Sequence, residues 1–240
     1  MIILLGVFIS QLVWGAPLGD ILAQSGEALI QSESLSSSVS LLLTLASIGF
    51  IPMFLMATTS FLRTVIILSM IRQAIGTAQA PPNPVIVILA LFVTAYTMAP
   101  VFTEVYDTAI MPYNNQEITQ LEAFQLGATP FREFMSRHVR ETDVQLFLDF
   151  SGSVVTDPDN IPFYILIPAF IISELKAAFQ VGFLIYLPFV VVDLLISNIL
   201  LTLGMFMLSP AMVSMPFKIL LFVLVDGWNL IVQGLLLSYQ

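Results

Sequence analysis

The stretch IPAFIISELKAAFQVGFLIYLPFVVVDLLISNILLTLGMFMLSP, residues 167–210, decides the fold class of this chain because it carries so little charge. Only Glu174, Lys176 and Asp193 interrupt it. A helix of about 20 apolar residues crosses the hydrocarbon core of a bilayer, so this stretch is long enough to span. The whole chain, 58% hydrophobic and 10% charged, is more apolar than a soluble domain. The sequence therefore predicts an all-α integral membrane protein.

The hydropathy pattern divides the chain into apolar segments separated by polar or proline-rich connectors. We expect Pro84 in the first turn of the second segment and a kink at Pro100. Pro188 is expected to begin a segment of its own. The expected helical segments are Leu41–Phe61, Val85–Val105, Ile161–Leu187, Pro188–Leu208 and Phe217–Leu237.

The basic residues predict the orientation of these segments. Arg63 and Arg72 follow the first segment and place that connector in the cytoplasm, as Lys218 does for the last one. Both connectors lie in the cytoplasm if the chain crosses the membrane four times and Ile161–Leu187 does not cross fully. Five full spans would put Lys218 outside. Residues 106–160, rich in acids, are then an excursion outside the cytoplasm.

The first forty residues read as a leader. Residues 1–15, MIILLGVFISQLVWG, have the apolar run and small final residues of a cleavable signal peptide, although no Lys or Arg precedes the run. A short anchored helix is the alternative. Residues 16–40 form a polar lead-in, and residues 41–240 are expected to be one helical membrane domain.

Residues 106–160 are expected to contain short helices. Thr129 and Pro130 fit the N-cap and first position of one helix. Its apolar residues then recur at helical spacing and predict one packing face. His138 belongs to this face and reads as a hydrogen-bonded interface residue, because no metal-binding cluster accompanies it. The face comprises Phe131, Phe134, Met135, His138 and Val139.

Ionisable residues within the apolar segments call for partners, because isolated charges in lipid are costly. We expect Lys218 to pair with Glu174, leaving Lys176 for Asp193 or a backbone carbonyl. Three roles fit such charges. They form an ion path, or Asp193 and Asp226 form an aspartyl dyad like that of proteases, or the charges make contacts between helices and subunits.

Composition and motifs argue against several functions. The chain lacks cysteine, which excludes disulfides and thiolate chemistry, and its net charge of −9 argues against binding nucleic acid. It has one histidine and neither a serine elbow nor an HExxH motif, so we expect no enzyme, metal site or cofactor. An ion-coupled transporter would show paired halves, and no internal repeat is evident.

The charged residues and prolines of the last third occur in an order that resembles one known family. This order is similar to that of the FliP family of flagellar type III export-gate proteins, whose virulence relatives are the SctR proteins. The matching elements are Glu174-Leu175-Lys176, Pro188-Phe189, Asp193-Leu194, Pro216-Phe217-Lys218 and Val225-Asp226-Gly227-Trp228.

The resemblance implies a non-enzymatic subunit of the flagellar basal body in the bacterial inner membrane. Several copies would assemble with FliQ and FliR, and with FlhB at the entrance, into a helical, cone-like channel made of bent helical hairpins. Membrane lipid and unfolded export substrates would be its other partners. A virulence export-gate subunit is the first alternative, and an ion-coupled membrane transporter is the second.

The resemblance also assigns roles to particular residues. A methionine-rich loop closes the pore in that family, and the matching positions here are Met205, Phe206 and Met207, of which Phe206 departs from the methionine pattern. Methionine is unbranched and polarisable, so a ring of such side chains suits a deformable hydrophobic seal. The alternative is that these methionines fill a gap in a core. The remaining residues are expected at subunit contacts: Glu174, Lys176, Asp193, Lys218 and Asp226, with Phe131, Phe134 and His138 meeting a neighbouring copy.

Overall fold

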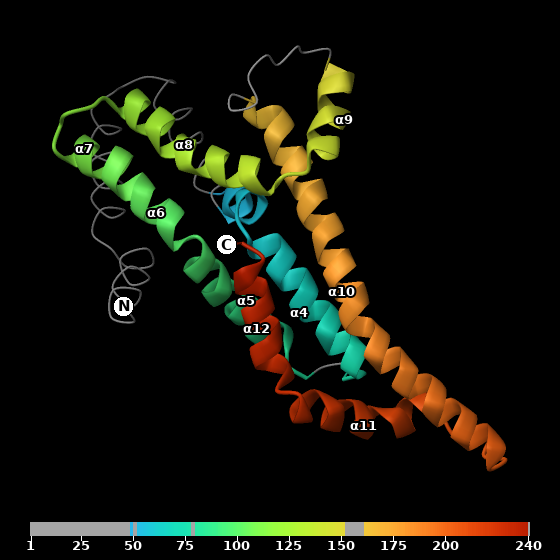
Figure 1. The fold of residues 1–240 in the computed structure, drawn as a ribbon. Coiled ribbons are helices and arrows are strands. Elements are labelled where there is room, and N and C mark those ends of the chain that lie inside the picture. The colour runs from blue at the N-terminus through green and yellow to red at the C-terminus, as the bar shows by residue number, and fades with distance from the viewer. Residues whose placement is uncertain (1–48, 50–51, 78–79, 152–160, 240) are drawn as a thin grey trace, which may run out of the picture. The chain divides into compact units, whose positions relative to one another are not determined.

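The apolar run after residue 160 forms one continuous helix, α10 (Phe163–Thr202), in the computed structural model of the chain (Figure 1). The structure describes residues 49, 52–77, 80–151 and 161–239. The expected break before Pro188 is therefore wrong: both Pro168 and Pro188 lie inside α10. A proline removes one backbone hydrogen bond, and here packing holds the helix together, since the adjacent Phe189 is buried. Forty residues make α10 about 60 Å long, twice the roughly 30 Å of a bilayer core.

Helix α4 (Phe61–Ile75) packs along α10. The contact is close at Gly182, where an added Cβ would lie 2.3 Å from the sulfur of Met70. Arg63 and Arg72 both lie inside α4, so their predicted place in a connector after the first span is wrong. Helix α4 ends at Gly76, which adopts the left-handed conformation common after a helix C-terminus.

The second apolar segment is a bent helix pair. Helix α5 (Asn83–Thr97) carries Pro84 in its first turn, as predicted. The helical stretch Ala99–Asn114, which begins with α6 (Ala99–Val105), follows at an angle of 59°. Pro100 lies in the first turn of α6, which confirms the predicted kink. The helix continues through the π-helical turn η1 (Tyr106–Ile110) into α7 (Met111–Asn114).

The acidic segment is helical, as predicted, and its first long helix starts earlier than expected. Helix α8 (Gln120–His138) begins at a capping box in which Thr119 and Glu122 bond to each other's backbone N–H groups. Two satisfied donors define this start, so Pro130 lies inside α8 and the predicted start at Thr129–Pro130 is wrong. Helix α8 crosses η1 closely, since a Cβ on Gly127 would lie 3.4 Å from Ala109 Cβ. Helix α9 (Glu141–Ser151) follows and packs on α10.

The last apolar segment is also broken rather than continuous. Helix α11 (Pro210–Leu224) and helix α12 (Gly227–Leu237) meet at 61°, so the predicted single helix Phe217–Leu237 is wrong. Asp226 stands at the break in the left-handed conformation, with a φ of 51°. Gly227 follows because the Phe222 ring occupies the space that a Cβ would need.

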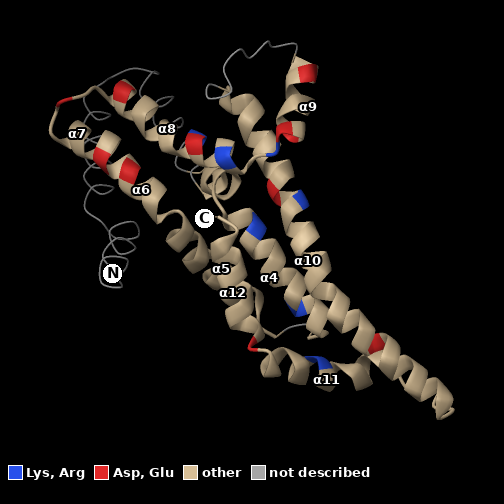
Figure 2. Cartoon of the chain, in the orientation of Figure 1, with Lys and Arg blue, Asp and Glu red and all other residues tan. Residues whose placement is uncertain are grey.

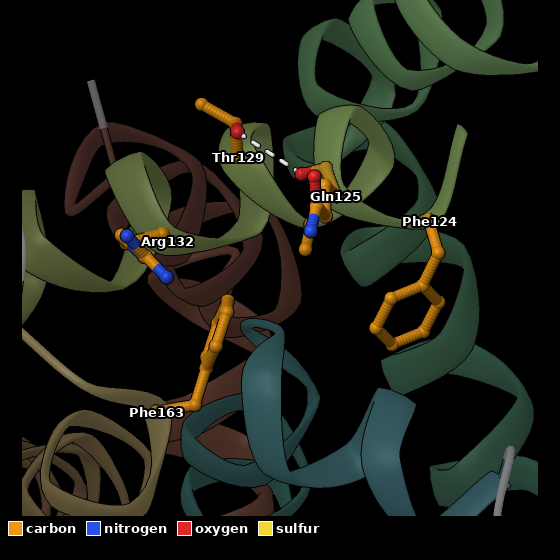
Figure 3. Close-up of a pocket in the computed structure, with 6 residues that line it drawn as sticks. Phe124, Gln125, Thr129, Arg132 and Phe163 are labelled. Atoms are coloured by element: carbon orange, nitrogen blue, oxygen red, sulfur yellow. Dashed lines mark hydrogen bonds between the residues drawn. The ribbon is translucent and has the colours of Figure 1, made fainter. Parts of the chain in front are cut away.

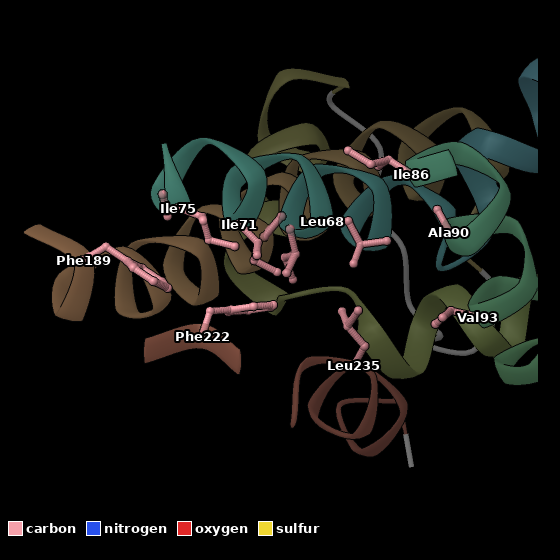
Figure 4. Close-up of a cluster of buried hydrophobic side chains, with 12 residues drawn as sticks. Leu68, Ile71, Ile75, Ile86, Ala90, Val93, Phe189, Phe222 and Leu235 are labelled. Carbon is pink, nitrogen blue, oxygen red and sulfur yellow. The ribbon is translucent and has the colours of Figure 1, made fainter. Parts of the chain in front are cut away.

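Two apolar clusters hold the described residues between Phe54 and Tyr239, which belong to one unit. The first joins α4, α5, α10, α11 and α12, and Figure 4 shows Leu68, Ile71, Phe189, Phe222 and Leu235 converging from four of these helices. The second joins α6, α8, α9 and α10 and contains the predicted packing face of α8, since Phe131, Phe134 and Met135 are all buried in it.

The described residues contain one helix, α10, that is long and apolar enough to cross a membrane. Three further spans result if each bent pair counts as one, including residues 52–58 with α4 at 79°. This range of one to four accommodates the predicted four-span arrangement. Which side of the membrane each connector faces stays a prediction. The predicted signal peptide 1–15 and lead-in 16–40 lie outside the described residues.

Two phenylalanines of α8 provide a matched test of this packing. Phe134→Ala should lower the free energy of unfolding by about 3–5 kcal/mol, because it empties a buried site. Phe124→Ala should have little effect, because that ring is 76% exposed. Thermal unfolding of the purified chain in detergent measures both, and equal losses would contradict the packing of α8.

Candidate functional site: buried charges and the methionine turn

The ion pair in which both side chains are most buried joins α4 and α10. The Arg63 guanidinium bonds both carboxylate oxygens of Glu174, with its Nε 3.0 Å from Oε2. Glu174 is fully buried and Arg63 is 8% exposed. The C-terminal turn completes the pair: the Tyr239 hydroxyl donates to Glu174, and Arg63 lies 4.2 Å from the Tyr239 ring centroid. Removal of either charge would leave the other buried without its partner.

A second ion pair joins α9 to α10. Lys176 bonds Asp143 Oδ1, and the Ser173 hydroxyl donates to Asp143 Oδ2 at 2.8 Å. The same hydroxyl accepts the backbone N–H of Arg140 at 3.0 Å. Burial raises the pKa of Asp143, but the bonds from Lys176 and Ser173 and the charges of Lys176 and Arg140 outweigh it, so the pKa lies below its ordinary value of 3.8.

A third ion pair joins α10 to α11, on either side of the methionine turn. Lys218 bonds Asp193 Oδ2, and the Ser214 hydroxyl donates to Asp193 Oδ1. Lys218 is 5% exposed, while Asp193 is half-buried. Because the pair bridges the two helices that flank residues 203–209, it fixes how these helices leave the turn.

These contacts correct the predicted pairings. Glu174 pairs with Arg63 and Lys218 pairs with Asp193, so the predicted pairs Glu174–Lys218 and Lys176–Asp193 are wrong within the chain. Asp226 lies at the exposed turn between α11 and α12, where it accepts from Asn229 at 3.1 Å and meets no cation among the described residues. It therefore does not form a dyad with Asp193, which is engaged by Lys218 and Ser214. Contacts of these charges with other subunits stay a prediction.

The distribution of charge is uneven along the described chain. Figure 2 shows acidic residues but no Lys or Arg on α6 and the turn η1 that follows it, while α5 and α7 carry no charged residue. Arg63, Lys176 and Lys218 belong to the ion pairs described above, whereas Arg72 at the end of α4 bonds Pro81 O and Asn83 in the loop that leads to α5.

The predicted seal residues occupy the turn between α10 and α11. Gly204, with a φ of 72°, closes α10 through bonds from its own N–H to Leu201 O and from Met205 N–H to Leu200 O. This pattern is a Schellman motif, which needs a residue that tolerates the left-handed conformation. Met205, Phe206 and Met207 are 45, 75 and 98% exposed. They do not fill a core gap of the chain, and the turn presents them outward.

The outer-segment residues pack inside the chain. The Phe134 ring lies 6.0 Å from Phe170 and 5.9 Å from Tyr239 between centroids, and Phe131 contacts Phe102 in the same cluster. His138 Nδ1 donates to Phe134 O at 2.7 Å, which supports its predicted role as a hydrogen-bonded residue, and its ring is half-buried against Tyr239. Contact of these residues with a neighbouring copy stays a prediction.

A separate cavity of about 380 Å³ opens between α8 and the start of α10 (Figure 3). It is mostly apolar. The Arg132 guanidinium lies 4.7 Å from the centroid of the Phe163 ring on its wall. The residues that line it are Phe124, Gln125, Ala128, Thr129, Arg132 and Phe163. None of the predicted site residues faces it.

Similarity to known proteins identifies the family of this chain. The model of the FliP family matches residues 42–235, nearly all of the described helices. The chain belongs to the FliP family. It is 45% identical over 208 residues to the flagellar biosynthetic protein FliP of Pectobacterium carotovorum subsp. carotovorum, an alignment that covers 86% of this chain and 81% of that protein.

Two further relatives carry the same name and agree over the same region. Flagellar biosynthetic protein FliP of Bacillus subtilis is 45% identical over 210 residues, covering 86% of this chain and 94% of the relative. That of Aquifex aeolicus is 43% identical over 210 residues, covering 86% and 88%. The resemblance read from the charges and prolines of the last third is therefore confirmed.

The sequence did not reveal the roles of Arg63, Asp143 and Tyr239. Arg63 and Asp143 lie 111 and 33 residues from their partners in the chain, and Tyr239 lies 65 residues from Glu174. The charges within the apolar segments called for partners, but no motif pointed to Arg63, Asp143 or Tyr239 as those partners.

Substitution of the Arg63–Glu174 pair distinguishes it from the pairing predicted from sequence. Glu174→Leu should destabilise the chain by about 3–5 kcal/mol, because it leaves Arg63 buried and unpaired. Adding Arg63→Leu should restore much of this loss, since two apolar side chains tolerate burial. Adding Lys218→Leu instead should restore nothing, and thermal unfolding that showed rescue by Lys218→Leu would contradict the observed pair.

Acid should weaken the Asp143 contacts. Because the folded-state pKa of Asp143 is lower than the unfolded value of 3.8, its contribution to stability is complete above that value and is lost as pH falls through the folded pKa. Asp143→Asn should therefore be less stable than the unsubstituted chain near pH 6, with a difference that shrinks towards about pH 3. A difference that grows on acidification would contradict the assignment.

Proposed function

We propose that this chain is a non-enzymatic pore subunit of the flagellar type III export gate, through which unfolded flagellar proteins cross the inner membrane. Membership of the FliP family and the names of its relatives support the flagellar system over a virulence system. The observation that carries the pore role is the exposed turn Met205–Phe206–Met207 between two apolar helices.

The turn has the properties that a deformable seal needs. Side chains that pack inside the chain have no freedom to close a shared channel, whereas these three are exposed at a tip whose backbone is fixed by the Schellman motif. Flexible thioethers exclude water and ions when several copies converge, and they repack around a passing chain without recognising its sequence. Phe206 adds a large apolar ring to the same tip.

The exposed apolar surface of the described helices supports assembly with other chains. Helix α10 is about twice as long as a bilayer core is thick, so lipid alone cannot cover its apolar surface. We propose that further copies, together with FliQ, FliR and FlhB, cover the remainder. The bent pairs α5–α6 and α11–α12 are the strongly bent elements that would build a cone-like oligomer.

The intrachain ion pairs give the charged residues a role within this proposal. Lys218 and Asp193 would hold the two arms of the seal turn together, and Arg63 with Glu174 would fix α4 on α10 before subunits meet. Where these charged side chains also reach a neighbouring copy, they would set subunit contacts. His138 would be an additional contact of the outer segment.

Replacement of the turn tests the seal. The substitution of Met205, Phe206 and Met207 together by Ala should make cells or reconstituted vesicles leak ions, because small side chains leave a wetted opening. The readout is ion efflux from vesicles that contain the assembled complex.

Met212→Ala is the matched control. Met212 is also an exposed methionine, at 71%, but it lies on α11 beyond the turn. It should leave the membrane ion-tight. An ion-tight complex with the triple substitution, assembled to the normal level, would contradict the seal.

A further inference from the structure

The C-terminal turn, Ser238 and Tyr239, connects the end of α12 to three other helices. The Tyr239 hydroxyl donates to Glu174 on α10, and the Arg63 side chain on α4 donates to Ser238 Oγ at 3.3 Å. The Tyr239 ring stacks at 5.9 Å on Phe134 and lies 5.2 Å from His138, both on α8. Two adjacent residues therefore contact the only buried ion pair that spans α4 and α10 within the described chain.

The opposite end of α12 is a turn rather than a continuous helix. Asp226 has a φ of 51°, a conformation that costs energy for a residue with a Cβ, and α12 leaves α11 there at 61°. The Asp226 carboxylate is exposed and bonds only within the turn, to Asn229. The Asp226 side chain therefore does not tie this junction to another helix, and the contact across it is that of the Trp228 ring with Phe222 of α11, 5.3 Å between centroids.

Between its two ends, α12 is held by one apolar face. Leu235 is buried in the first apolar cluster, with Ile231, Val232 and Leu236 partly buried beside it. On the other face, Leu230 and Leu237 are 57 and 58% exposed. Within the part of the chain that the structure describes, Ser238 and Tyr239 make the side-chain hydrogen bonds that join the C-terminal end of α12 to other helices.

We propose that Ser238 and Tyr239 form a latch that holds α12 closed against the other helices, with the turn at Asp226 as its hinge. Opening of the latch frees α12 and exposes Arg63 and Glu174 in the same movement, because Tyr239 covers both. The state of α12 is therefore coupled to the ion pair that joins α4 to α10. This proposal does not depend on the pore function.

The absence of cysteine from the chain allows a direct test by thiol labelling. Leu235→Cys places one thiol on the buried face of α12, where Leu235 is 3% exposed. In the purified full chain, a maleimide reagent should label this thiol slowly. Adding Tyr239→Ala should speed labelling about tenfold or more, since a hydrogen bond to a charged group is lost together with the ring contacts. Tyr239→Phe, which removes only the hydroxyl, should give an intermediate rate.

Three controls separate an open latch from a damaged fold. Tyr113→Ala, at a tyrosine 45% exposed and outside the latch, should not change labelling at position 235. Leu237→Cys, at an exposed position, should be labelled rapidly with or without Tyr239. Ala74→Cys, at a fully buried position on α4, should stay protected in the Tyr239→Ala chain.

Two results would overturn the latch. Unchanged protection at position 235 in the Tyr239→Ala chain would show that the apolar face alone holds α12. Equal acceleration at positions 74 and 235 would show that Tyr239 stabilises the fold as a whole and does not control α12 in particular.

Discussion

The buried ion pair between Arg63 and Glu174 is the interaction on which the arrangement of this chain depends. A carboxylate with no exposure needs its charge balanced, and the guanidinium on α4 is the group that balances it. Since two helices contribute the pair and the C-terminal turn adds Tyr239 and Ser238, the requirement fixes the relative positions of α4, α10 and the end of α12. Apolar packing along α4 and α10 stabilises the contact between the two helices, and the Arg63–Glu174 pair selects one alignment of α4 along α10.

The two other ion pairs repeat this principle elsewhere on α10. Asp143 pairs with Lys176, two residues after Glu174, and holds α9, while Asp193 pairs with Lys218 in the C-terminal part of the helix and holds α11. The charges that interrupt the apolar run are therefore attachment points for neighbouring elements. Their spacing along α10 decides where α4, α9 and α11 attach. The methionine turn follows from the last of these attachments, since it is the connection between α10 and α11.

The positions of helices were largely predictable, and their boundaries at prolines were not. Pro84 and Pro100 act locally, one in a first turn and one at a kink, and both were predicted. Pro130 and Pro188 also resembled helix starts, but each lies within a helix. The deciding factor at Pro130 is the capping box at Thr119 and Glu122, and at Pro188 it is the burial of Phe189. The break at Asp226 shows the reverse, because an apolar stretch without an internal proline beyond residue 216 still bends.

The sequence by itself determined that the chain is helical, strongly apolar and a member of the FliP family, and it located the methionine turn and the apolar face of α8. These properties depend on composition, periodicity and the order of residues, and all three can be read from residues that are close together in the sequence. Only the tertiary structure decided which charges pair. Arg63 and Glu174 lie 111 residues apart, and the identity of a charged residue does not indicate which opposite charge it meets in the fold. It also decided that Phe131 and Phe134 pack within the chain while Met205, Phe206 and Met207 face outward, since burial is set by the helices that pack around a side chain.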